Sequence, residues 1–541
     1  MKNYNCSSIS FSSFINKTLN KERLKKNLLF ITLINFIWLS LRTGSKPSRI
    51  IYPCQQAAVG NLSITMSTII PHSILTSFFT IKTYLSKNRA TFLLILIIGV
   101  FMGGLFLRPQ VDNVSQEILL NFESKEATSF PASDIYVVSG LNEAHFSKLI
   151  NLMISHDLFF YQSNSDGENK SINGLIAQND VVLLKINSQW PTRGGTNTDL
   201  LKEVIQAIIG HPDGFNGEII VADNGQGRGH MDFGYSNAEN TSQSTQDVVD
   251  SISSTYSQVS TYDWQGIRSK SVDEYSEGDI SDGYIVYDTP DPETGIYVSY
   301  PKFETQFGTQ ISFKNGIWNG TGYEKRLKVI NMPVLKSHVI YGVTASSKNY
   351  MGVQSEILAG GLANGHECVA TGGMGTLMAE CGLPTLNIID AIWVNANPYP
   401  SSSTGPSTNY DEATRVNTLV AGVDPIALDY WAANHILIET AKLIGYDNTQ
   451  SLDPDNNERG GLGEAFGVWL NLSKEELLRA DYNVTSNENS LNVFVYEAQV
   501  PSSTSLPRNT TSPNQTSSFS IVLLVLSLII IVSLQQQRKN A

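Results

Sequence analysis

The sequence predicts an α/β protein with a doubly wound, mainly parallel sheet, a long insertion and flanking transmembrane helices. Three observations lead to this fold class. Apolar strand-like runs alternate with amphipathic helical segments between residues 134 and 445, a polar stretch interrupts them at about 225–315, and charge-free apolar runs lie at 91–107 and 519–534. Strands that alternate with helices indicate parallel pairing through helical crossovers.

The first elements follow from the spacing of apolar residues. Residues 134–140 (DIYVVSG) predict a strand, and the segment 142–156 predicts a helix whose apolar face carries Phe146, Leu149, Ile150 and Met153. These four residues recur at helical spacing, which places them on one side of the helix.

A βαβ unit comes next. The continuous apolar runs 181–187 and 218–224 are typical of strands that are buried on both faces of a sheet. The helix between them is capped by Asn197 or Thr198 and ends at Gly210. Strand, helix and strand in this order make the two strands parallel and the crossover right-handed.

Two more buried strands and a helix follow the polar stretch 225–315. The strands are expected at 327–333 and 386–394. The helix is expected at 425–443, because Asp424 can cap it, proline occupies its first turn and glycine follows its end.

The two charge-free runs predict membrane spans and a topology. Basic residues precede the run 91–107 and follow the run 519–534 (Lys82, Lys87 and Arg89; Arg538 and Lys539). Basic flanks stay on the cytoplasmic side. Both runs therefore place the α/β domain, 134–498, on the extracytoplasmic face of a cell membrane.

The remaining segments complete this organisation. Residues 1–90 are expected to be membrane-associated, with a further span or a signal-sequence core at 27–41. Residues 501–518 are rich in Ser, Thr and Pro and predict a disordered stalk. Stalk, span and basic tail resemble the carboxyl-terminal anchors of archaeal surface proteins.

Charge and cysteine content narrow the function. A net charge of −13 argues against a nucleic-acid partner, which needs a surplus of Lys and Arg. The four cysteines form no CxxC pair, so no iron–sulfur cluster is expected. Cys368 and Cys381 would form a disulfide in an oxidising space, or remain separate thiols, and the sequence leaves both open.

Polar residues gather where the predicted strands end. In open parallel sheets, ligands bind outside the carboxyl ends of the strands. Lys185 and Asn187 end one strand, and Asp223 ends the next. Lys336 and His338 follow the third strand, and Asp390 lies within or near the end of the fourth. Such residues also have structural alternatives. The stem of a lysine can cover an apolar edge of the sheet. Asp424, at the start of the later helix, fits a helix cap better than a ligand.

Four blocks of the sequence resemble one family. VVLLKINSQWPTRGGTNTD, EIIVADNGQG, VINMPVLKSHVIYGVTASSKNYMGV and LVAGVDPIALDYWAA are similar to the signature blocks of the bacterial and archaeal family called domain of unknown function 362. The resemblance covers roughly residues 134–445. The matching positions are Lys185, Asn187, Thr198, Lys336, His338, Lys348, Asn349, Gly352, Asp424, Pro425 and Asp429.

The resemblance implies no settled reaction. Many members of the family carry ferredoxin-type cysteine clusters, which this sequence lacks, and that puts an electron-transfer role in doubt. The first hypothesis is an enzyme acting on a small anionic substrate, with a divalent metal as the cofactor to test; a surface ligand-binding module and a structural surface protein are the alternatives. Within the first hypothesis, Lys336, His338 and Lys185 are the catalytic candidates, Asn187, Thr198, Lys348 and Asn349 bind substrate, and Asp223, His366, Asp390 and Asp429 hold metal.

Overall fold

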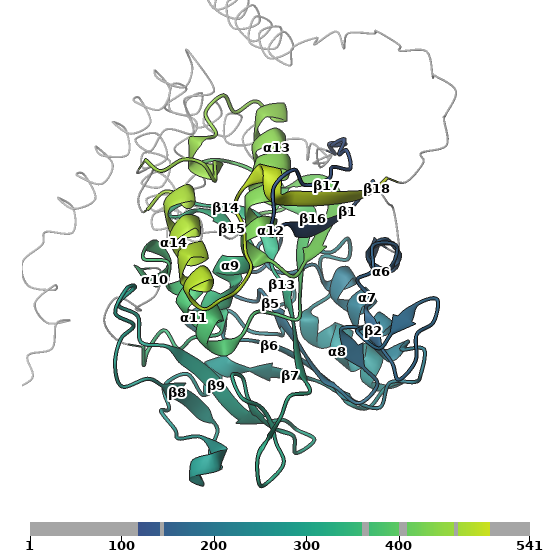
Figure 1. Ribbon diagram of the computed structural model, residues 1–541, viewed down its shortest axis with the longest axis vertical. Helices are drawn as coiled ribbons and strands as arrows, with labels where there is room; N and C mark the ends of the chain where they lie inside the picture. Colours follow the sequence, from purple (N-terminus) through teal and green to yellow (C-terminus); the bar gives the residue numbers. More distant parts are fainter. Residues whose placement is uncertain (1–116, 141–144, 360–366, 400–407, 459–463, 498–541) are drawn as a thin grey trace, which may run out of the picture. The chain divides into compact units, whose positions relative to one another are not determined.

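A ten-stranded sheet forms the centre of the computed structural model (Figure 1), which describes residues 117–140, 145–359, 367–399, 408–458 and 464–497. Eight strands follow one another across the sheet, and a hairpin of two short strands joins it beside β16. The order across the sheet is β18 (Leu491–Glu497), β1 (Ser133–Ser139), β17 (Thr414–Gly422), β16 (Leu386–Asn395), β13 (Leu327–Met332), β5 (Val181–Ile186), β6 (Glu218–Asp223) and β7 (Val259–Asp263), and the hairpin strands are β14 (Val334–His338) and β15 (Gly342–Thr344).

The half of the sheet from β16 to β7 is parallel throughout. Helices α7 (Thr198–Ile209) and α8 (Thr245–Ser253) connect β5 to β6 and β6 to β7. Asn197 caps α7, since its side chain accepts the backbone N–H groups of Asp199 and Leu200. On the other side of β16, β17 runs antiparallel and β1 and β18 are parallel to each other.

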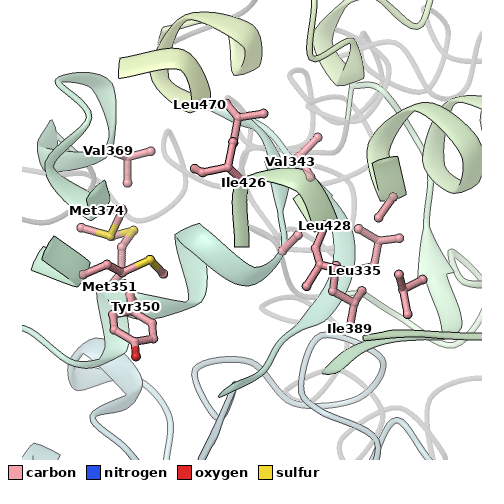
Figure 2. Packing of buried hydrophobic residues seen from close by; sticks show 14 of the residues in the cluster. Leu335, Val343, Tyr350, Met351, Val369, Met374, Ile389, Ile426, Leu428 and Leu470 are labelled. Atoms are coloured by element: carbon pink, nitrogen blue, oxygen red, sulfur yellow. The ribbon is translucent and has the colours of Figure 1, made fainter. Parts of the chain in front are cut away.

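Helices cover both faces of the sheet, because alternate strand residues point to opposite sides. Val182 and Leu184 of β5 belong to the core beneath α6 (His145–Ile154), α7 and α8. Val181 and Leu183 belong to a second core, on the side of α9 (Ser346–Asn349), α11 (Gly373–Cys381), α12 (Pro425–Ala432) and α14 (Phe466–Arg479). Figure 2 shows part of this second core, where Leu335, Val343 and Leu428 lie among the packed side chains.

The segment 225–315 contributes to two sheets. Its β7 forms one edge of the central sheet. Its β8 (Gly283–Val286), β9 (Ser299–Glu304) and β10 (Gln310–Ser312) join β11 (Gly316–Trp318) and β12 (Tyr323–Glu324) in a separate antiparallel sheet. A small sheet of β2 (Tyr161–Gln162), β3 (Lys170–Ser171) and β4 (Ile176–Ala177) lies outside both.

The α/β class is confirmed, but the flanking transmembrane helices are not part of the observed fold and that prediction is corrected. Within the described ranges, no helix is long and apolar enough to cross a membrane. A membrane span needs about 20 predominantly apolar residues. The runs 27–41, 91–107 and 519–534 and the stalk 501–518 lie outside the described residues. The extracytoplasmic location stays a prediction.

Both ends of the described chain meet at one edge of the central sheet. β1 lies between β17 and β18, so the first strand of the sheet has the last two as its neighbours. Beyond β18, Lys125 and Val493 exchange backbone hydrogen bonds of 2.8 and 2.7 Å. The segment before β1 thus covers part of an edge that would otherwise present unpaired backbone groups.

Candidate functional site

A row of polar side chains crosses the parallel half of the sheet. Lys185 of β5, Asn331 of β13 and Asn387 of β16 are register partners on three adjacent strands, and all three are fully buried. The Asn331 amide donates to Asn387 Oδ1 (2.9 Å), and the Asn349 amide donates to Asn331 Oδ1 (2.8 Å). Buried amides need such partners, so this row fixes α9 against the sheet.

Lys185 forms a buried ion pair with Asp223 across the ends of β5 and β6. Lys185 Nζ lies 2.9 Å from Asp223 Oδ1, and the other carboxylate oxygen accepts the backbone N–H and the hydroxyl of Ser188. A Cβ atom on Gly352 would lie 2.0 Å from Asp223 Oδ1 and 2.7 Å from Lys185 Nζ. Glycine at 352 therefore lets the backbone cross directly over the pair.

The β14–β15 hairpin presents a polar face opposite its core face. Leu335 and Val343 pack in the core of Figure 2, and their neighbours in the sequence, Lys336 and Thr344, are register partners on the other face. Both polar residues are buried, at 1% and 4% exposure. Lys336 Nζ donates to the carbonyl oxygen of Gly194.

Asp429 of α12 holds the short helix α9 in place. Its two carboxylate oxygens accept the backbone N–H groups of Ser346 (2.6 Å) and Ser347 (2.9 Å). The following residues of α9, Lys348 and Asn349, are thereby brought to the ends of β5 and β14.

These elements enclose one polar pocket. Its empty volume is about 330 Å³, including its opening to solvent, which is at the lower end for small-molecule sites. Of the side chains that the sequence placed at strand ends, Asn187, Asp223 and Lys336 meet here, together with residues of the loops after β5 and β6. The lining residues are Asn187, Gln189, Trp190, Asp223, Gln226, Lys336, Thr344, Lys348, Asn349 and Gly352.

The pocket holds two lysines for which no carboxylate partner is found among the described residues. Burial holds the pKa of Lys336 well below its usual range, and the nearby charge of Lys348 lowers it further. Burial also lowers the pKa of Lys348 to about 8. Lys185 differs, because Asp223 opposes the effect of burial on its pKa. Burial in this pocket therefore favours the neutral form of both amines.

The other residues predicted for the site have structural contacts. His338 Nδ1 accepts the backbone N–H groups of Ile340 and Tyr341, both at 3.2 Å, and does not line the pocket. Thr198 follows the cap of α7 and shares a hydrogen bond with Ser236 (2.6 Å). Asp424 caps α12, as expected, accepting from Ile426 and Ala427.

The residues predicted to hold a metal are not gathered at one point. Asp390 accepts from the backbone of Asn197 and Ile392 and from the Asn237 amide, while Asp223 and Asp429 are engaged as described above. Burial raises the pKa of Asp390 to about 6 and that of Asp429 to about 7. Within the described ranges, no group of three His, Cys, Asp or Glu residues could hold a metal ion. His366 lies outside those ranges, so the metal stays a prediction. Cys368 and Cys381 are not bonded to each other.

Several residues of the site were missed by sequence reasoning. Gln189 and Trp190 lie in the loop after β5, and Gln226 lies in the loop after β6. The strand-end rule would have found them if it had been extended a few residues into each loop. Asn331 gives a weaker signal, a single amide inside an apolar strand. Thr344 gives none, because its place depends on pairing with Lys336.

Comparisons with known proteins give one match. Residues 322–434 match a family described as Domain of unknown function (DUF362). The matched segment contains Lys336, Lys348, Asn349 and Asp429, whereas Lys185 precedes it. The resemblance predicted from the sequence is thus confirmed over this segment. Neither the search of curated proteins nor that of solved structures found a match.

Proposed function

We propose that this chain, whose segment 322–434 belongs to the DUF362 family, is an enzyme that holds a small anionic substrate between Lys336 and Lys348. One observation carries the proposal: two buried lysines line one pocket, and no carboxylate of the described residues forms an ion pair with either. Isolated buried charges are costly and require a partner. An anion that pairs with the Lys348 ammonium group beside the Lys336 amine supplies that partner.

The surroundings of the two lysines suit an oxyanion. The Asn349 side chain, the hydroxyl of Thr344 and the indole N–H of Trp190 belong to the lining. Neither the Thr344 hydroxyl nor the Trp190 Nε1 atom has a hydrogen-bond partner among the described residues, although both atoms are buried. A phosphate or carboxylate would accept hydrogen bonds from such donors.

The same pocket supports proton transfer. Burial and the nearby charge of Lys348 both lower the pKa of Lys336, which favours the neutral form of its amine. A neutral amine beside a bound anion acts as a general base: its lone pair takes a proton from the substrate and becomes an ammonium ion that stabilises the charge left behind. Strongly shifted pKa values in a polar pocket favour this catalytic function over simple capture.

Calorimetry with inorganic phosphate tests the anion site. Binding favours the protonated form of Lys348 and raises its pKa, so we expect proton uptake near pH 8, measured as a dependence of the binding heat on the buffer. Affinity should fall as the pH rises above about 8, because Lys348 then loses its charge.

Variants make this test specific. Lys336→Met and Lys348→Met should each weaken phosphate binding at least ten-fold. Lys302→Met removes another buried lysine, which lies in β9 and pairs with Asp279, and should leave binding unchanged. Phosphate binding without proton uptake, or equal binding by all three variants, would contradict the proposal.

A chemical probe tests the neutral amine. Glyoxylate is a small anionic aldehyde; a neutral lysine attacks its carbonyl carbon, water leaves, and the resulting imine is reduced by cyanoborohydride to a stable secondary amine. At pH 7 we expect peptide mass spectrometry to find Lys336 modified ahead of exposed lysines such as Lys442. Phosphate should protect Lys336. Uniform labelling of exposed lysines with Lys336 untouched would rule out its function as a base.

A further inference from the structure

A second pocket adjoins the first. Asn187 and Trp190 line both, and the second pocket has an empty volume of about 290 Å³, including its opening to solvent. Its other walls come from the loop after β5, the start of α7 and the loop that precedes α8. A ligand held by the lysines can therefore extend past Trp190 into a second space.

The two pockets differ in chemistry. The first contains lysines and other donors, whereas no Asp, Glu, Lys or Arg is among the residues that line the second. The second contains aromatic rings, Phe233 and Tyr235, and many hydroxyl and amide groups. His230, which also lines the second pocket, already has Asp232 as its ion-pair partner, so this lining disfavours a second ionic group on the ligand.

Two amide oxygens of the second pocket are left without partners. Asn237 is 1% exposed and donates through its amide nitrogen to Asp390 (3.0 Å), but its Oδ1 accepts no hydrogen bond from the described residues. Asn187 Oδ1 is also buried without such a partner. A buried acceptor left unsatisfied costs free energy, and a ligand that donates to it recovers that cost.

We propose that the ligand is a hydroxylated anion, a sugar phosphate or sugar acid, whose anionic group lies between Lys336 and Lys348 and whose hydroxyl groups donate to Asn237 and Asn187. Both acceptors are neutral amide oxygens and no carboxylate lines the second pocket, so they suit hydroxyl donors better than ammonium groups. The Phe233 ring supplies an apolar surface for the carbon skeleton. This inference rests on the proposed function, because it extends the same anion site.

Matched pairs of probes separate the two halves of the ligand. Methyl phosphate and acetate carry the anion without hydroxyl groups, and glucose 6-phosphate and gluconate carry it with them. We expect at least one hydroxylated anion to bind ten-fold more tightly than its matched plain anion, measured by calorimetry at pH 7. The preferred pair identifies phosphate or carboxylate as the anionic group.

Variants of the second pocket assign this gain to its residues. Asn237→Leu and Phe233→Ala should abolish the ten-fold gain while leaving methyl phosphate and acetate binding unchanged. Phe233 is only half-buried, so the anion affinities of Phe233→Ala can be measured even where Asn237→Leu fails to fold. Lys336→Met should weaken all four probes.

The outcomes distinguish this inference from the proposed function. Plain anions that bind as tightly as the hydroxylated ones, or a gain that survives in Phe233→Ala, would overturn the sugar-like ligand and leave the anion site standing. Absence of binding by all four probes would remove both proposals. If the second-pocket variants lose the tighter binding of hydroxylated anions but still bind the plain anions, the result would support both the anion site and the sugar-like ligand.

Discussion

Gly352 shows how one residue controls the geometry of the site. The backbone at this position passes so close to the Lys185–Asp223 ion pair that there is no room for a Cβ atom. Both charges are buried, so neither can turn to water if the pair is forced apart. A buried pair is costly to break, because each charge then lacks compensation.

We therefore expect Gly352→Ala to lower the free energy of unfolding by about 3 kcal/mol. Urea denaturation followed by circular dichroism measures this change. Gly266→Ala is the matched control, since a Cβ there would meet nothing within 4 Å, and it should stay within about 0.5 kcal/mol of the native protein. Equal stability of the two variants would show that the Lys185–Asp223 pair can move to make room for a Cβ atom at little cost in free energy.

At the scale of residues, the sequence predicted some of the polar residues that line the pocket but missed others, such as Gln189, Trp190 and Thr344. Lys336 and Asn187 line it, as the strand-end rule indicates, and Lys348 lines it as the family resemblance implies. His338 was placed by the same rule, but the turn after β14 brings two backbone N–H groups onto its Nδ1 atom. That turn geometry depends on the pairing of β14 with β15, which local sequence patterns do not contain.

At the scale of elements, α12 is tied to the rest of the fold through its N-cap residue. The Asp424 carboxylate caps the helix and also accepts from the Ser133 hydroxyl (2.6 Å) and the Thr485 backbone N–H (2.8 Å). It thus joins the helix to the start of β1 and to the loop before β18. Since α12 carries Asp429, this cap supports the position of α9 and its lysine.

We expect Asp424→Ala to reduce the free energy of unfolding by about 2 kcal/mol, because the cap and both tertiary contacts are lost. The cap of α8 offers a comparison: Ser244 bonds only within its own capping box, so Ser244→Ala should cost about 1 kcal/mol. Thermal and urea unfolding measure both. A larger loss for Ser244→Ala would show that the contacts beyond α12 contribute nothing.

The buried parallel strands were predictable because their apolar runs are continuous. The expected strands 181–187, 218–224 and 327–333 correspond to β5, β6 and β13 within one residue at their ends. β17 was not predicted, because Arg415, Asn417 and Thr418 interrupt its apolar pattern. It forms a strand because β1 and β16 pair with it on either side.

At the scale of the whole molecule, the order of strands lay beyond sequence reasoning. Periodicity shows that a strand is buried, but not which strand lies next to it. β13 separates β5 from β16, although residues 187–326 lie between β5 and β13 in the chain. The site depends on this order, since the row Lys185, Asn331 and Asn387 exists only when these three strands are adjacent.

The place of β1 between β17 and β18 also bears on how the protein is made. Asp134 and Asn492, which bond across β1 and β18, are separated by 358 residues. At about 5–20 residues per second, a ribosome needs roughly 20–70 s to synthesise the chain between them. Until β17 is synthesised the apolar β1 has neither neighbour available, and until β18 follows it still lacks one, so pairing with another nascent chain competes with folding. Completion of the central sheet must therefore wait until synthesis of the domain has ended.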